Sequence, residues 1–199
     1  MGRTSDAKEK LMEAAWELIW AGSYSGTSVD HICESAGVRK GSFYHFFESK
    51  VALAKAGLDD AWRKHPAELA HFFPPQPPPL ERLSRLCDYI VSDQRQCAEK
   101  HGRVLGCPVH TLGSEVSTWE LDLQGKIQEA IAKHSRYIES ALREAAADGL
   151  IPAVPDPSTR TKIVSAYIEG LLMQARILND LSILLPMGDG VRMIARMTA

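Results

Sequence analysis

The segment GVRKGSFYHFFESK, residues 37–50, constrains the fold more than any other part of the chain. A glycine-containing turn is followed by two cations, a small pair of residues and five consecutive rings. In a short helix, Phe43 and Phe47 would share an inward face because they are four residues apart. The outward face would then carry Lys40, Gly41, Ser42, Tyr44 and His45. Such a face behind a tight turn suits a helix that enters a DNA groove, and it also fits a surface helix of an ordinary bundle.

Two helical patterns precede this segment. Apolar residues recur at helical spacing over residues 7–19, and Gly22 favours a helix end. Thr27 or Ser28 can cap a second helix, with Asp30 in its first turn. Two short helices joined by a tight turn and braced by a longer helix are typical of a helix-turn-helix.

The rest of the chain also has the pattern of helices. Ser49 can cap a fourth helix, which we expect to end near His65 because Pro66 follows. Pro74–Pro79 reads PPQPPP and indicates a stiff extended connection. Beyond it, apolar stripes predict helices over residues 80–100, 117–148, 156 onwards and 189–197, with a shorter segment from Pro108. The predicted fold class is therefore all-α.

Five motifs resemble the DNA-binding domain of the TetR family of transcriptional regulators in order and spacing. They are TSVDHI at 27–32, AGV at 36–38, KGSFYHFF at 40–47, SK at 49–50 and AL at 52–53. The resemblance implies that residues 1–50 form a three-helix helix-turn-helix domain that binds a palindromic operator in double-stranded DNA, usually as a repressor. It also implies that residues 51–199 form a helical domain that binds an inducer and makes a homodimer.

The family motif also assigns expected DNA contacts. Thr27, Tyr44 and Lys50 would hold phosphates. The residues expected to face base edges or the groove wall are Lys40, Gly41, Ser42 and His45, and Arg39 could do either. Lysine and arginine can donate to guanine acceptors, serine can serve either base type, and glycine lets the backbone come close.

The dimer prediction depends on the helix that begins at Asp156-Pro157. This helix is apolar around most of its girth and needs cover on all sides. With the last helix, residues 189–197, it would form a four-helix bundle with its symmetry mates. Alternatively, the two helices close the core of the monomer.

Cys107 is the candidate sensing residue. The pattern G-C-x-x-x-x-L-x-x-E-V over residues 106–116 resembles a segment of the NemR-like branch of the family, in which a cysteine at this place responds to electrophiles and oxidants. A helix starting at Pro108 would place the thiol at a helix N-terminus, which favours the thiolate, and His110 could help. The alternative is a structural cysteine, since cysteine is among the most buried residue types.

A small apolar or aromatic inducer held without a covalent bond is the other sensing mode. Candidate lining residues, each of which could equally belong to the core, are Trp119, Tyr137, Tyr167, Met173 and His134.

Composition excludes several other classes. The net charge of −2 means that a DNA-binding chain must concentrate its cations locally. The four cysteines have no zinc-ligand spacing, so we expect no metal or cofactor, and no catalytic motif indicates an enzyme. No signal peptide or bilayer-spanning run is present, so we expect a cytoplasmic protein without a membrane partner. The competing function is a helical dimeric small-molecule-binding or scaffold protein that does not bind DNA.

Overall fold

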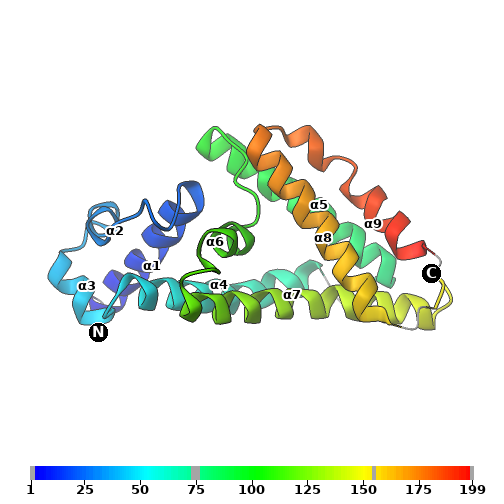
Figure 1. Ribbon diagram of the computed structural model, residues 1–199, viewed down its shortest axis with the longest axis horizontal. Coiled ribbons are helices and arrows are strands. Elements are labelled where there is room, and N and C mark those ends of the chain that lie inside the picture. Colours follow the sequence, from blue (N-terminus) through cyan, green and yellow to red (C-terminus); the bar gives the residue numbers. More distant parts are fainter. Residues whose placement is uncertain (1–2, 73–76, 154–155, 198–199) are drawn as a thin grey trace. The chain divides into compact units, whose positions relative to one another are not determined.

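The computed structural model describes residues 3–72, 77–153 and 156–197, and within these ranges every regular element is a helix (Figure 1). The all-α prediction is therefore confirmed. Contacts divide the chain into two compact units: Met1–His65 with Pro108–Ala130, and Pro66–Cys107 with Ile131–Ala199. The helices α4 (Lys50–Phe72) and α7 (Leu121–Ala147) contribute to both units. The predicted domain boundary between residues 50 and 51 falls within the first turn of α4, which begins at Lys50, and it remains a prediction.

The first unit contains α1 (Arg3–Ala21), α2 (Val29–Ala36), α3 (Lys40–Phe46), α6 (Pro108–Val116) and parts of α4 and α7. Helix α1 packs against α2, α3 and α6. Each of the four helices α1 to α4 supplies a side chain that is at most 1% exposed, namely Leu11, Ile32, Phe43 and Leu53. Burial of such side chains is the main source of stability for short helices, which are marginal by themselves.

The turn between α2 and α3 is determined by local signals. The Ser28 hydroxyl accepts a hydrogen bond from the backbone N–H of His31 at 3.1 Å and caps the start of α2. Gly37 ends α2 with φ at +62°, a left-handed conformation that glycine adopts without strain. The N–H of Val38 then returns to the carbonyl of Cys33 at 2.9 Å. This geometry ends one helix and starts the next within three residues, as the sequence predicts.

The second unit contains α5 (Pro79–His101), α8 (Pro157–Leu178), the short 3₁₀ helix η1 (Leu181–Leu184), α9 (Met187–Arg196) and the second part of α7. In Figure 1, α9 lies beside both α5 and α8, and these elements are in contact. Their shared core includes side chains from all of these elements, among them Leu83, Leu142, Val164, Leu184 and Val191.

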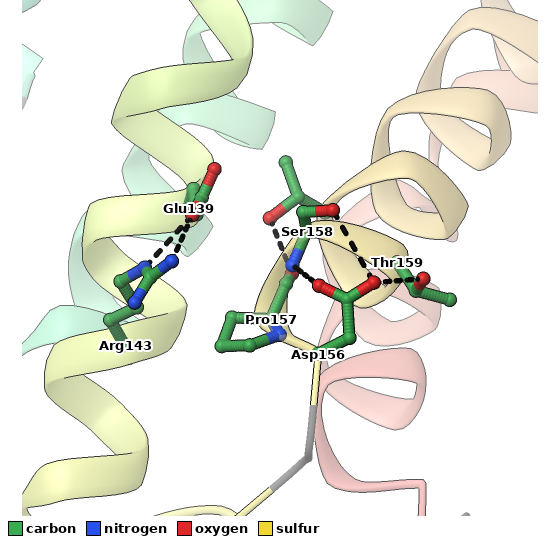
Figure 2. Close-up of polar contacts among 7 residues, drawn as sticks. Glu139, Arg143, Asp156, Pro157, Ser158 and Thr159 are labelled. Atoms are coloured by element: carbon green, nitrogen blue, oxygen red, sulfur yellow. Dashed lines mark hydrogen bonds and ion pairs between the residues drawn. The ribbon is translucent and has the colours of Figure 1, made fainter.

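The start of α8 shows why a helix begins there. Asp156 accepts the backbone N–H of Ser158 at 3.0 Å and the hydroxyl of Thr159 at 2.6 Å (Figure 2). Pro157 occupies the first helical turn, where its missing N–H is tolerated. Figure 2 also shows the ion pair between Glu139 and Arg143 on the neighbouring turns of α7. The predicted start at Asp156-Pro157 is confirmed.

Some predicted boundaries are wrong. Helix α4 continues to Phe72 instead of ending near His65, because one proline removes one backbone hydrogen bond and good helix formers follow it. The turn η1 was not predicted. Of the proline-rich connection, Pro74–Gln76 lies outside the described residues, and α5 begins at Pro79. Within the three described ranges, no helix is both long and apolar enough to cross a membrane.

Candidate DNA-binding face and sensing site

Two buried rings hold α3 in place. Phe43 is fully buried and Phe47 is 4% exposed, so the predicted burial of both rings is confirmed, although Phe47 follows the last residue of α3 with an extended backbone. Their ring centroids lie 5.9 Å apart, and Tyr44 meets Phe43 edge to face at 5.2 Å. Aromatic pairs at these separations add stability beyond the area that they bury. The helix therefore has a fixed orientation even though it is seven residues long.

The opposite face of α3 is available to a partner. Arg39, Lys40, Gly41 and His45 are exposed, and the Tyr44 side chain is 55% exposed. A Cβ atom added to Gly41 would meet nothing within 4 Å, so the backbone is open to close approach at this point. Ser42, which is half-buried, completes the predicted set on this helix. A helix face that carries exposed donors can reach base edges in a major groove.

Lys40 already has an internal partner. Its ammonium lies 2.8 Å from a carboxylate oxygen of Asp30 on α2, and both side chains are more than half exposed. The hydrogen bond that the ammonium donates to Asp30, together with the negative charge of Asp30, raises the pKa of Lys40. An exposed pair of this kind contributes little to stability. Lys40 is therefore a charged group that can exchange Asp30 for a phosphate or a guanine.

Thr27 and Lys50 bind the loop between α1 and α2. The buried Thr27 hydroxyl donates to the carbonyl of Ser23 at 2.7 Å. The Lys50 ammonium donates to the carbonyls of Tyr24 at 2.8 Å and of Thr27 at 2.9 Å, and it lies 4.1 Å from the Tyr24 ring centroid. Burial lowers the pKa of Lys50. These contacts show how the two residues shape the loop, and their contact with phosphate remains a prediction.

Helix α6 binds the same loop through Glu115, a residue that the sequence analysis did not single out as a site residue. Its carboxylate accepts the backbone N–H groups of Tyr24 and Ser25, each at 2.7 Å. Burial alone would raise the pKa of Glu115, but the hydrogen bonds from Ser25 and Tyr24 and the charge of Lys50 outweigh it and hold the pKa below its ordinary value. The motif around residue 115 was visible in the sequence, whereas a partner 90 residues away was not.

Trp119 belongs to this contact. Its ring is 53% exposed and lies 6.0 Å from the Tyr24 ring, centroid to centroid. Its indole N–H donates to the carbonyl of Glu115 at 2.9 Å. Trp119 was predicted as a lining residue of an inducer pocket, and the structure gives it this packing role in the first unit.

In the second unit, a tightly held loop carries the candidate thiol. The buried side chain of Gln94 on α5 accepts the N–H of Gly106 at 2.6 Å and donates to its carbonyl at 3.3 Å. Asn179 accepts the N–H of Val104 at 2.9 Å, and Arg176 donates to the carbonyl of Leu105. Three consecutive residues before Cys107 are therefore bonded to α5 or to the end of α8. Sequence spacing gave no signal for these long-range contacts.

Cys107 contacts a carboxyl group on α8. It is half-buried, whereas Cys33, Cys87 and Cys97 are buried. The Cys107 Sγ lies within 4.8 Å of a Glu169 carboxylate oxygen, and the thiol donates a hydrogen bond to that carboxylate. Burial raises the pKa of Glu169 to about 7, and the bond from Cys107 opposes this rise. The pair places a nucleophile beside a group that can accept its proton.

The remaining predicted sensing residues do not gather in one unit. His110 is half-buried on α6 in the first unit, and burial lowers its pKa. Tyr137 is half-buried on α7 in the second unit. Tyr167 on α8 packs against α9, where its hydroxyl donates to the carbonyl of Pro186 at 3.4 Å and occupies the space that a Cβ on Gly190 would need.

These features define a helix-turn-helix regulator with an anchored recognition helix and a separate helical core. Residues 11–56 match the model for bacterial regulatory proteins of the tetR family, and residues 79–184 match the model for a tetracyclin repressor-like C-terminal domain. The chain belongs to the TetR family and is a DNA-binding transcriptional regulator. Regulators of this family bind DNA operators and small-molecule ligands and act as dimers.

Two curated relatives and one solved structure extend the comparison. The chain is 30% identical over 182 residues to an uncharacterised HTH-type transcriptional regulator in the lacX 3′ region of Lactococcus lactis, covering 90% of this chain and 88% of the relative. It is 26% identical over 176 residues to the HTH-type transcriptional repressor NemR of Escherichia coli, covering 86% and 85%. The crystal structure of reduced E. coli NemR has a TM-score of 0.81 at 20% identity, covering 94% of this chain and 96% of that one, which supports the fold. The relatives are named as regulators, in agreement with the prediction that the chain is not an enzyme.

Proposed function

We propose that the chain is a homodimeric repressor that acts in the cytoplasm, binds a palindromic operator through α3 and leaves it when Cys107 reacts with a small electrophile or oxidant. The observation that carries the DNA-binding part is the anchored α3, whose buried face fixes a cation-bearing exposed face. Membership of the TetR family supports the same use of this helix. Two copies related by a two-fold axis would meet the two halves of a palindrome.

The assignment of DNA contacts follows the exposure of the side chains. Tyr44 and Arg39 are exposed, and their side chains suit phosphate contacts. Lys40 and His45 are exposed on the same helix and suit base edges, with Ser42 and Gly41 along the groove wall. Thr27 and Lys50 support the site by fixing the loop before α2, and we retain them as phosphate contacts in the proposal.

The exposed side of α8 and α9 supports the proposed dimer. Val164, Ile168 and Leu172 face the core of the second unit. On the other side of α8, Ile163 is 47% exposed and Ile177 is 69% exposed. These two lie 14 residues apart, close to four helical turns, and so share one face. Further exposed apolar residues are Leu178 at the end of α8, Leu185 after η1, Met193 on α9 and Met197 after α9. A face of this kind suits the second copy of the chain.

The accessibility of the thiol supports Cys107 as the sensor. Of the four cysteines, it alone is not buried, and the loop before it is bonded to two helices. An adduct on the sulfur would need volume inside this held loop, so it would favour a different arrangement of the loop. Release of DNA requires that the modified chain prefer a conformation that fits the operator less well.

The test has two parts. An operator is first selected from a random duplex library with the wild-type chain, and its affinity is measured over a series of salt concentrations. A DNA-binding regulator loses affinity steeply as salt rises, whereas a scaffold protein that does not use DNA selects no sequence. The complex is then treated with a mild electrophile, while Cys107 modification is followed by mass spectrometry and release by fluorescence anisotropy. Release that persists undiminished in Cys107→Ala eliminates the thiol switch and favours a non-covalent inducer.

A further inference from the structure

The contact between Cys107 and Glu169 combines two unusual placements. Glu169 is a carboxyl group in the middle of α8, a helix whose neighbouring residues Ile168 and Leu172 belong to the core. Cys107 ends the loop that Gln94 and Asn179 hold, so the thiol is kept against this helix. The Cys107 Sγ lies within 4.8 Å of a Glu169 carboxylate oxygen, and the thiol donates a hydrogen bond to that group. This contact supplies a direct path for the proton of the thiol.

The chemistry of a thiol requires such a path. The thiolate is the nucleophile, and an ordinary thiol with a pKa near 8.5 is mostly protonated at pH 7. An ordinary glutamate is too weak a base to hold this proton. Burial raises the pKa of Glu169 to about 7, so it lies closer to the pKa of an ordinary thiol than the pKa of an ordinary glutamate does. General bases are most effective when their pKa lies near the working pH.

We propose that Glu169 is the proton acceptor that generates the Cys107 thiolate when an electrophile arrives. The proposal rests on Cys107 being the sensing thiol, and it deepens that proposal by assigning a role to a second residue. In this proposal Glu169 acts through Cys107.

The step balances without an oxidant or a leaving group when the electrophile is an α,β-unsaturated carbonyl compound. The thiol proton moves to the Glu169 carboxylate, and the sulfur electron pair forms a bond to the β-carbon. The carbon–carbon π electrons move to give an enolate. The carboxylic acid of Glu169 then returns a proton to the α-carbon, which leaves a thioether on Cys107 and a carboxylate on Glu169.

Other ionisable groups are carried by the surrounding elements. Arg176 follows Glu169 by seven residues on α8, and Arg103 lies on the loop. Asp93 precedes Gln94 on α5, and His110 follows Cys107 by three residues at the start of α6. Arginine side chains do not lose their proton in proteins and therefore add no pH-dependent step. Among these groups, Glu169 and His110 are the ones that can give a pH-dependent step near neutrality.

The experiment measures the rate at which Cys107 reacts with N-ethylmaleimide between pH 5.5 and 9, resolved by peptide mass spectrometry in the full chain. The wild-type rate is expected to rise with a midpoint near pH 7. In Glu169→Gln this rise should disappear, leaving only the rise that follows the thiol's own ionisation. The variant should react at least about tenfold more slowly than wild type at pH 7.5. Glu169→Asp should keep the step at a lower rate.

Three outcomes would overturn the proposal, and a fourth separates it from the role of Cys107 as the sensor. If Cys107 reacts in Glu169→Gln as fast as in wild type or faster, the carboxylate only repels the thiolate and is not its base. A step that is lost in His110→Asn but kept in Glu169→Gln identifies histidine as the base. If Glu169→Gln does not fold, a wild-type profile without a rise near pH 7 rejects the proposal by itself. Adduct formation with the expected profile but without operator release leaves the proton transfer intact and rejects Cys107 as the sensor.

Discussion

Glu115 on α6 accepts the backbone N–H of Tyr24 at 2.7 Å, across 91 positions of the sequence. The same carboxylate accepts the N–H of Ser25, so one side chain holds the loop that leads into α2. Two hydrogen bonds from neutral donors to one carboxylate are stronger than the same bonds to a neutral acceptor. The position of α6 and the shape of this loop are therefore linked.

We expect Glu115→Ala to lower the free energy of unfolding by about 1–2 kcal/mol. The contact is partly exposed, so water can replace the carboxylate as the acceptor of the two N–H groups. Urea denaturation followed by tryptophan fluorescence measures this change. Glu129→Ala on α7 is the matched control, since Glu129 makes an exposed ion pair with Lys126. A loss of equal size in both variants would contradict a specific role for Glu115.

The Glu115 contact should also depend on pH. The pKa of Glu115 is lower in the folded chain than in the unfolded chain, where it is 4.5. The carboxylate therefore stabilises the fold at pH values above 4.5. This contribution disappears as the pH falls from 4.5 through the folded pKa. The difference in unfolding free energy between wild type and Glu115→Gln should therefore be constant from pH 7 to 5.5 and shrink below pH 4.5. A difference that grows on acidification would show that the assigned sign is wrong.

Lys40→Ala should weaken binding to the selected operator by about 1–3 kcal/mol and relax its sequence preference. Tyr44→Phe should weaken binding to all DNA sequences alike, because a phosphate contact carries no sequence information. Anisotropy titrations at fixed salt measure both effects. Lys162→Ala, which removes an exposed lysine of α8, is the control and should bind like wild type. Unchanged affinity in both α3 variants would refute the assignment of this face.

Gln94→Leu should lower the free energy of unfolding by about 2–4 kcal/mol. Leucine has a similar volume but leaves the N–H and carbonyl of Gly106 without their partner in a buried place. The loop before Cys107 should loosen at the same time, so hydrogen exchange over residues 103–107 should accelerate. Gln128→Leu, an exposed change on α7, is the control. Unaltered exchange in Gln94→Leu would show that the other bonds of the loop suffice.

Ile177→Lys should break the proposed dimer and weaken operator binding. The new charge would have to be desolvated on a face that the second copy covers. Sedimentation velocity measures the change in oligomeric state. Ala132→Lys, which adds the same charge at an exposed position of α7, should remain dimeric. If Ile177→Lys sediments like wild type, the interface lies elsewhere.

Local signals in the sequence predicted the helix-turn-helix well. Ser28 and Gly37 delimit α2 through local contacts. The Ser28 hydroxyl accepts a backbone N–H of the first turn, and Gly37 adopts the positive φ that ends the helix. Phe43 and Phe47 were predicted to be buried from their spacing alone. By contrast, the predicted end of α4 near His65 was wrong, because a single proline is a weaker signal than the helix formers that follow it.

The contacts that organise the candidate sites could not be predicted. Glu115 with Tyr24, Gln94 with Gly106 and Glu169 with Cys107 each join residues that are distant in sequence or on different elements. A polar side chain on a helix gives no sign of the backbone group that it will meet. The sequence therefore indicated Cys107 as a candidate sensing residue, but it gave no sign of the groups that hold this loop.

The ion pair between Lys40 and Asp30 has a consequence for the search along a genome. Every duplex that engages Lys40 must first displace the same aspartate, so the penalty is equal for the operator and for random DNA. Only a site that returns enough favourable contacts to base edges overcomes it, while the many competing sites bind less tightly. In this proposal Asp30 competes with DNA for Lys40 and shortens the time spent on every sequence by the same factor, so the binding preference has to come from the contacts to base edges.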